Sequence, residues 1–126
     1  MKALIVDDNL QCRILLGRIL RKAFAFDIVE ATNGVEALDC IAAGTPDILF
    51  LDYEMPAMNG KDTLKAIRSQ KPLETLPVVI VTAHSEEDVV REMLAYKVSH
   101  YVVKPFTAND IIRRVLAIFP TISPSS

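Results

Sequence analysis

The feature that most constrains the fold of this chain is an alternation of two kinds of segment. Short, continuously apolar segments alternate with longer segments in which apolar residues recur every three or four positions. Uninterrupted apolar segments are typical of strands that are buried on both faces of a parallel sheet. On this basis we predict five strands, at Ala3–Val6, Asp27–Ala31, Asp47–Leu51, Pro77–Val81 and His100–Val103.

An amphipathic helical pattern follows each predicted strand. Helix N-caps are predicted at Asn33, Ser85 and Thr107, because each has an acidic residue three positions later. The apolar rows that define the five helices begin at Leu10, Val35, Leu64, Val89 and Ile111. Five strand–helix repeats predict an α/β fold of the (βα)5 type, a doubly wound parallel five-stranded sheet with helices on both faces.

Composition excludes several classes of protein. The 126 residues fit one domain, and 51% are hydrophobic, which is enough for a packed core. With 14 Lys and Arg against 16 Asp and Glu, the chain lacks the basic excess of a nucleic-acid-binding protein. The longest apolar run, Val115–Phe119, is far shorter than the ~20 residues of a membrane span. We therefore expect a cytoplasmic domain without direct nucleic-acid or membrane binding, with Cys12 and Cys40 as free thiols.

Polar residues gather where the predicted strands end. Asp7 and Asp8 follow the first strand, Asp52 the third, Thr82 the fourth and Lys104 the fifth. In open α/β sheets, sites form outside the carboxyl ends of the strands, so these side chains are expected to meet. Two carboxylates about 4 Å apart repel by about 4 kcal/mol at an effective dielectric constant near 20. Such a cluster needs cations: Lys104 supplies one charge, and an all-oxygen site of this kind suits Mg²⁺.

A carboxylate in such a site can also act as a nucleophile toward phosphorus and form an aspartyl phosphate. Phosphoryl transfer depends mainly on positioning and on neutralising the charge of the phosphoryl oxygens. A metal ion, a lysine and a hydroxyl donor are suitable groups for that purpose. The strand ends therefore point to chemistry with phosphoryl groups.

Four motifs, in this order and each at a strand end, resemble those of response-regulator receiver domains, including the single-domain chemotaxis type. The resemblance runs from Ala3 to about Phe119, and the motifs are Val6–Asp8, Leu51–Gly60, Val81–Ala83 and Tyr101–Phe106. It implies a flavodoxin-like sheet with strand order 2-1-3-4-5. It also implies a receiver domain over residues 1–120 and a short tail over 121–126.

The resemblance further implies a two-component signalling function. Asp52 would accept a phosphoryl group from a sensor histidine kinase or a phosphotransfer protein, in a Mg²⁺-dependent reaction. Asp7, Asp8, Asp52 and the backbone carbonyl of Glu54 would hold the Mg²⁺ ion. Lys104 would contact a phosphoryl oxygen. The domain would be a phosphoacceptor and not an enzyme, beyond catalysing its own phosphorylation and dephosphorylation.

The output of such a domain is a protein contact. Thr82 would hydrogen-bond the phosphoryl group, Tyr101 would then turn inward, and the face formed by the fourth helix, fifth strand and fifth helix would change. By the same resemblance Val90, Leu94 and Arg114 lie on this face, together with Tyr101. A downstream target protein would bind there, and the chain would be a monomer or a phosphorylation-dependent dimer.

Two residues beside the site admit two interpretations. Glu54 lies two positions after Asp52, and His84 lies two positions after Thr82. In receiver domains these positions border the site and tune the lifetime of the phosphoryl group. Both could equally be exposed loop residues without a role.

The sequence also departs from the receiver pattern. Many receivers have Gly-Ala where this chain has Lys97-Val98. Glycine after a helix permits a left-handed backbone that lysine and especially valine adopt poorly. We therefore expect the loop before the fifth strand to follow a different path. The resemblance also implies a cis bond between Lys104 and Pro105.

Three other functions compete with this prediction. A dehalogenase-like phosphatase requires Asp-x-Asp after the first strand, whereas Asp7 and Asp8 are adjacent. A flavodoxin-type cofactor binder requires a loop that attracts phosphate, and the acidic pair repels it. A pseudo-receiver, an interaction module that is never phosphorylated, remains the main alternative.

Overall fold

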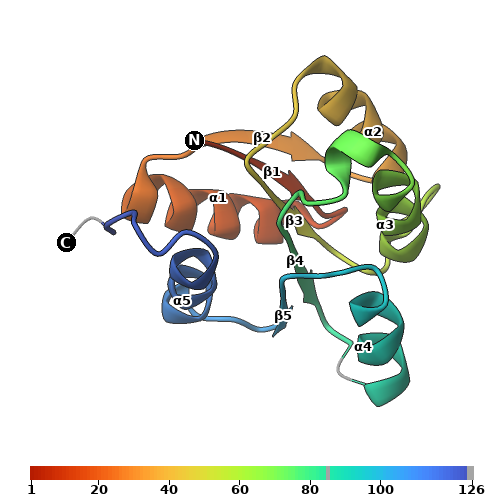
Figure 1. Ribbon diagram of the computed structural model, residues 1–126. Coiled ribbons are helices and arrows are strands. Elements are labelled where there is room, and N and C mark those ends of the chain that lie inside the picture. Colours follow the sequence, from red (N-terminus) through yellow and green to blue (C-terminus); the bar gives the residue numbers. More distant parts are fainter. Residues whose placement is uncertain (85, 125–126) are drawn as a thin grey trace.

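The computed structural model of the protein describes residues 1–84 and 86–124, and this part of the chain contains five strands and five α-helices in strict alternation. A short 3₁₀ helix, η1 (Lys71–Leu73), precedes the fourth strand. Figure 1 shows the arrangement of β1 (Lys2–Val6), α1 (Leu10–Phe24), β2 (Asp27–Ala31), α2 (Gly34–Ala43), β3 (Ile48–Leu51), α3 (Gly60–Arg68), β4 (Val78–Thr82), α4 (Glu87–Leu94), β5 (His100–Val103) and α5 (Ala108–Ile118).

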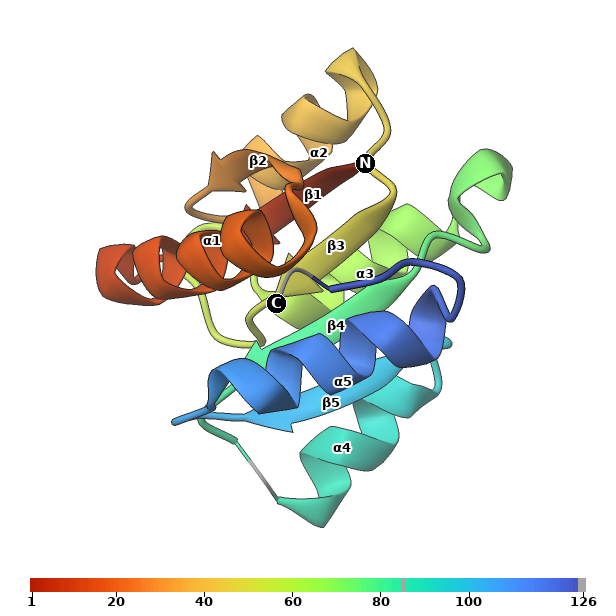
Figure 2. The same ribbon diagram turned by 90° about the vertical axis from the view of Figure 1, so that its left-hand side faces the viewer.

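All five strands are parallel and lie in the order β2-β1-β3-β4-β5, which confirms the predicted topology. Helices α1 and α5 cover one face of the sheet, and α2, α3 and α4 cover the other (Figures 1 and 2). The order reverses between β1 and β3, where β1 is flanked by β2 on one side and β3 on the other. Such a switch point opens a crevice at the carboxyl ends of the strands.

The continuous apolar strands are explained by burial on both faces. All four residues of β3 are at most 1% exposed. Leu49 and Leu51 pack into a cluster with residues of α2 and α3, while Ile48 and Phe50 pack into a second cluster with residues of α1 and α5. Period-2 alternation of polar and apolar residues is absent from β3 because both of its faces are covered.

Helix starts follow the local sequence. Asn33 accepts a hydrogen bond from the Glu36 N–H, and Thr107 forms a capping box with Asp110, so both predicted N-caps are confirmed. The third predicted cap, Ser85, lies outside the described residues. Among the helices of the described chain, none is long and apolar enough to cross a membrane.

The loop between α4 and β5 contains a left-handed residue despite its lysine. Lys97 has φ 58°, so it adopts the conformation that glycine would have provided, and the expected different path is not observed at this residue. Arg68 stabilises the loop because its guanidinium donates hydrogen bonds to the carbonyls of Tyr96 and Lys97, at 2.8 and 3.1 Å. The Lys104–Pro105 bond is cis, as expected.

Candidate functional site

Main-chain hydrogen bonds between neighbouring strands continue into the residues that form the site. The Asp52 N–H donates to the Val6 carbonyl at 2.9 Å, which fixes the end of β3 beside the end of β1. The Lys104 N–H donates to the Thr82 carbonyl at 2.8 Å, which does the same for β5 and β4. Regular pairing thus continues one residue past the strands, and the four strand ends meet at one edge as predicted.

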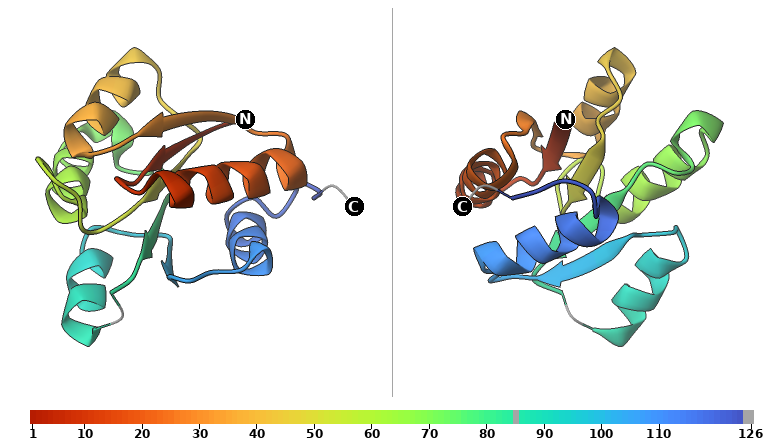
Figure 3. Two further views of the ribbon diagram at one scale, coloured as in Figure 1. Left: turned by 180° about the vertical axis from the view of Figure 1, so that it is seen from behind. Right: turned by 60° about the vertical axis from the view of Figure 1, so that its left-hand side comes forward.

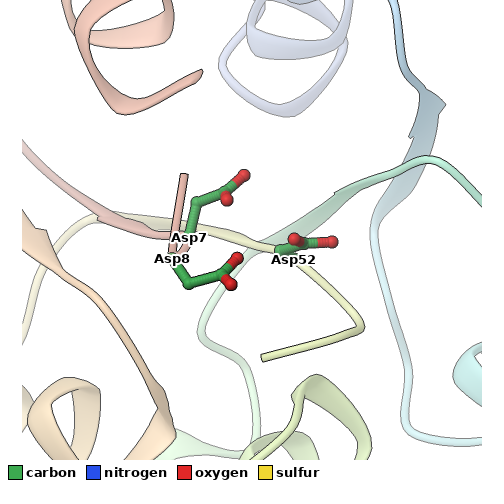
Figure 4. A group of neighbouring side chains, drawn as sticks. All are labelled: Asp7, Asp8 and Asp52. Carbon is green, nitrogen blue, oxygen red and sulfur yellow. The ribbon is translucent and has the colours of Figure 1, made fainter. Parts of the chain in front are cut away.

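Three carboxylates form the centre of this edge. Asp7, Asp8 and Asp52 each offer an oxygen, and these oxygens all lie within 4.8 Å of one another. Asp7 and Asp8 directly follow β1, and Asp52 directly follows the neighbouring strand β3, so the three side chains lie close together (Figure 4). Asp7 is 2% exposed and Asp52 7% exposed, whereas Asp8 faces solvent. Two buried carboxylates and one exposed carboxylate provide hard oxygen ligands with room for water, which fits Mg²⁺.

Lys104 lies between the two buried acids. Its ammonium is 2.7 Å from Asp7 Oδ2 and 3.4 Å from Asp52 Oδ2. The remaining oxygens accept main-chain hydrogen bonds: Asp7 Oδ1 from the Asn9 N–H at 2.9 Å, and Asp52 Oδ1 from the Tyr53 N–H at 2.8 Å. The carboxylates are therefore held in fixed orientations.

The electrostatic balance of the site is not complete. Burial raises the pKa of Asp52, the charge of Asp7 raises it further, and Lys104 offsets only part of this increase. Burial lowers the pKa of Lys104, but the hydrogen bond to Asp7 and the charge of Asp52 outweigh it, so the net shift is upward. One lysine does not fully neutralise the two buried acids, and an additional cation would stabilise the ionised form of Asp52.

An open cleft of about 590 Å³ lies above these groups. Thr82, 1% exposed, contributes to its floor from the end of β4. Other lining residues come from the loops after β1, β3, β4 and β5: Asp8, Asn9, Asp52, Glu54, Met55, Pro56, Asn59, Ala83, His84 and Lys104. The structure thus brings together five predicted groups, namely the three acids, the hydroxyl and the ammonium.

Glu54 and His84 contact each other across the mouth of the cleft. His84 Nε2 lies 2.8 Å from Glu54 Oε1, and His84 Nδ1 lies 3.3 Å from Glu86 Oε2. The hydrogen bond to Glu54 raises the pKa of His84. The ring of Tyr53 packs edge-on against the His84 ring, with centroids 5.9 Å apart. These two residues are in a position to cover the cleft, and the structure leaves their predicted role untested.

The four residues predicted to form a partner face lie on α4, β5 and α5, which are neighbours in Figure 2. Leu94 is 53% exposed, whereas Val90, Tyr101 and Arg114 are partly buried. The Tyr101 hydroxyl is buried, and no described residue accepts or donates a hydrogen bond to it. Burial of a hydroxyl without a hydrogen-bond partner costs about 1–3 kcal/mol, so the present position of the Tyr101 hydroxyl is energetically unfavourable.

Cys12, which the sequence predicts to be a free thiol, is unpaired and partly buried. Cys12 lies in the first turn of α1, where its N–H donates to the capping side chain of Asn9 at 2.9 Å. Burial, followed by a hydrogen bond to Asp7, raises the pKa of its thiol to about 12.

We expect Cys12 to be chemically inert in the folded protein. At about pH 8, alkylation of Cys12 by iodoacetamide should be about 50-fold slower in the native state than in urea. The higher pKa lowers the thiolate fraction, and the greater nucleophilicity of a more basic thiolate compensates only in part. Quantitative peptide mapping would measure this ratio, with Cys40 from the same digest as the internal comparison. Equal rates in both states would contradict the prediction.

Fold and site together define a class of protein: a doubly wound α/β domain with an acidic, lysine-containing cleft at its switch point. The profile of the response regulator receiver domain matches residues 3–116. The chemotaxis protein CheY of Pseudomonas aeruginosa is 38% identical over 123 residues, which cover 98% of this chain and 99% of that protein. The chemotaxis protein CheY-3 of Vibrio cholerae is 37% identical over 119 residues, covering 94% and 92%.

A solved structure gives the same result. The structure of a putative response regulator from Chloroflexus aurantiacus superposes with a TM-score of 0.87 at 29% identity, covering 94% of this chain and 97% of that one. This chain belongs to the response regulator receiver domain family. It is a signalling domain of the CheY type, and membership implies a place in two-component signal transduction.

Proposed function

We propose that Asp52 is the phosphoacceptor of this receiver domain and that the reaction depends on Mg²⁺. The observation that carries the proposal is the cluster of three carboxylates within 4.8 Å, with the Lys104 ammonium between Asp7 and Asp52. An Asp52 oxygen forms the new bond to phosphorus as the bond from phosphorus to the donor's leaving group breaks. Lys104 and Thr82 line the same cleft and are suitable donors to the phosphoryl oxygens.

The acidic cluster fits a divalent cation. Asp7, Asp8 and Asp52 would hold Mg²⁺ together with the backbone carbonyl of Glu54, and the ion would neutralise charge on the phosphoryl group. The incomplete neutralisation of Asp52 supports this assignment, because the site has more negative charge than Lys104 can balance. We assign the receiver domain to residues 1–120 and a tail to residues 121–126, although Ile122 packs against the core cluster beside α1 and α5.

The donor would be a sensor histidine kinase or a phosphotransfer protein in the cytoplasm. A donor must bring its phosphorylated side chain to the cleft, and α1 offers an apolar surface beside it. Leu10, Ile14 and Leu15 are 44–56% exposed, and Ile14 and Leu15 line a second cleft that shares Asn9 and Lys104 with the first. Exposed apolar patches of this kind mark protein contacts. We assign donor docking to α1, and target binding to the face of Val90, Leu94, Tyr101 and Arg114.

Intact mass spectrometry tests the phosphoacceptor assignment. After incubation with a small acyl phosphate and Mg²⁺, we expect one added phosphate on the wild type. No phosphate should be added to Asp52→Asn or to wild type in EDTA. Asp62→Asn removes an exposed carboxylate of α3 and should be phosphorylated normally. Absence of phosphate on a folded wild type would favour the pseudo-receiver alternative.

We also propose that Glu54 and His84 control how fast the phosphoryl group is lost. Their side chains meet over the mouth of the cleft, where they restrict the approach of an attacking water molecule. Glu54→Ala and His84→Ala should therefore shorten the half-life of the phosphorylated protein, by about 2- to 10-fold if one water-excluding contact is lost. The decay of the phosphorylated mass in EDTA measures this rate. Wild-type decay in both variants would reject the proposal.

A further inference from the structure

Helix α4 is weakly attached to the rest of the molecule. It has 8 residues, and only Met93 is buried, whereas four residues of α1 and four of α3 are buried. It lies at a corner of the molecule, beside the edge strand β5 (Figures 1 and 3). The side chain of its N-cap residue, Glu86, makes no cap hydrogen bond and lies against His84 instead. Apolar packing of α4 against the core is therefore limited to Met93 and the partly buried Val89.

Two sets of polar contacts hold α4 and the loop after it against α3. At the start of α3, Lys61 Nζ lies 2.5 Å from Glu92 Oε1 of α4. At the end of α3, the Arg68 guanidinium donates to the carbonyls of Tyr96 and Lys97, which directly follow α4. The two links act near opposite ends of α3, so each restrains a different part of α4 and its loop.

The Arg68 link is the stronger of the two. Besides the carbonyls after α4, its guanidinium binds the carbonyls of Leu73 and Leu76 at 2.7 and 2.8 Å. A planar guanidinium with several donors fixes such an arrangement, and a lysine could not replace it. The Lys61–Glu92 pair has only one contact, and its side chains are 44% and 34% exposed. Ion pairs exposed to this degree are weak.

Tyr53 connects the weak link to the site. Its N–H donates to Asp52 Oδ1 at 2.8 Å, and its ring packs against His84. Its hydroxyl lies within hydrogen-bonding reach of the Glu92 carboxylate. Tyr53 thus links the proposed phosphoacceptor and the mouth of the cleft to Glu92.

We propose that the Lys61–Glu92 ion pair is a latch that restrains α4 and that the Arg68 contacts form the hinge about which α4 moves when the latch opens. The link to signalling rests on the proposed function, because phosphorylation of Asp52 alters the hydrogen bond to Tyr53 and so disturbs the surroundings of Glu92. A strong hinge with a weak latch permits movement without unfolding.

Hydrogen–deuterium exchange of the unphosphorylated full chain tests the latch directly. In Lys61→Met, amides of residues 87–94 should exchange about two- to fivefold faster than in wild type, the range expected for loss of one exposed ion pair. Amides of α1 and α5 should be unchanged. Lys65→Met is the matched control, because Lys65 lies one turn further along α3 and is exposed. Equal effects of the two substitutions on α4 would overturn the latch.

Two further variants separate the latch from the hinge. Glu92→Gln should match Lys61→Met, and the double variant should exchange no faster than either, because both remove one interaction. Arg68→Lys should also accelerate exchange of residues 95–99, which Lys61→Met should leave unchanged. Additive effects of Lys61→Met and Glu92→Gln, or acceleration of residues 95–99 by Lys61→Met, would contradict the proposal.

Hydrogen–deuterium exchange of the phosphorylated protein tests whether phosphorylation opens the latch. In wild type that carries phosphate, residues 87–94 should exchange faster than in the unphosphorylated protein, and Lys61→Met should reduce this difference. Unchanged exchange in a sample shown by mass to be phosphorylated would overturn the link. If no phosphate is added at all, the proposed function fails, while exchange in the unphosphorylated variants still decides whether the latch exists.

Discussion

Gly60→Ala is expected to lower the free energy of unfolding by about 3–4 kcal/mol and to abolish the phosphorylation proposed at Asp52. A Cβ at residue 60 would overlap the main-chain carbonyl oxygen of Asp52 and lie 2.7 Å from the Tyr53 Cα. Backbone cannot rotate away as a side chain can, so α3 and the end of β3 must separate. Separation also lengthens the 2.7 Å hydrogen bond from the Gly60 N–H to the Tyr53 carbonyl.

Thermal denaturation and intact mass measure the two effects. The melting temperature should fall by about 10–15 °C. Gly17→Ala is the matched control: a Cβ there meets its nearest atom, a flexible Arg21 guanidinium nitrogen, at 3.4 Å. Since alanine favours an α-helix over glycine by about 0.5–1 kcal/mol, this variant should be slightly stabilised and normally phosphorylated. Similar melting temperatures of the two variants would show that the stability of the fold does not depend on the close approach of α3 to the end of β3.

The position of Asp52 could be predicted because it depends on regular structure. A strand buried on both faces gives a continuous apolar segment, so its end can be read as the first charged residue. The same reasoning placed Asp7, Thr82 and Lys104 at one edge of the sheet. Parallel pairing then brings these residues together without detailed knowledge of the loops.

Contacts made through loops could not be predicted. Glu54 and His84 meet only because two loops from different strands bend toward each other over the cleft. The left-handed Lys97 is a similar case: the local sequence argues against it, and the stabilising guanidinium of Arg68 lies 29 residues away in the chain. Local propensity carries no information about such a partner, and tertiary contacts override it.

The charges of the site were likewise predictable from the sequence, but their contacts were not. The sequence predicted that three carboxylates need cations, but only the structure shows that Lys104 binds Asp7 more closely than Asp52. The raised pKa of Asp52 means that its ionised form is less stable in the fold than in the unfolded chain. Its contribution to stability is therefore unfavourable above its folded pKa and disappears as the pH falls below its unfolded pKa.

Lys104→Met is expected to destabilise the metal-free protein by about 3 kcal/mol near pH 7.5. Asp7 and Asp52 would remain buried beside each other without their cation, and removal of one partner from a buried ion pair typically costs about 3–5 kcal/mol. The loss should shrink as the pH falls and the pair takes up a proton. Mg²⁺ should stabilise this variant more than wild type, because the ion replaces the missing positive charge.

Urea denaturation in EDTA and in Mg²⁺ measures these differences. Asp52→Asn should act in the opposite direction and stabilise the metal-free protein, since it removes an ionised carboxylate that is buried and is repelled by Asp7. In the Lys104→Met background, Asp52→Asn should stabilise the protein by more than it does in wild type, because Lys104 no longer offsets the repulsion between Asp7 and Asp52. Additive single effects would mean that Lys104 acts through packing alone, and the charge balance proposed for the site would then be wrong.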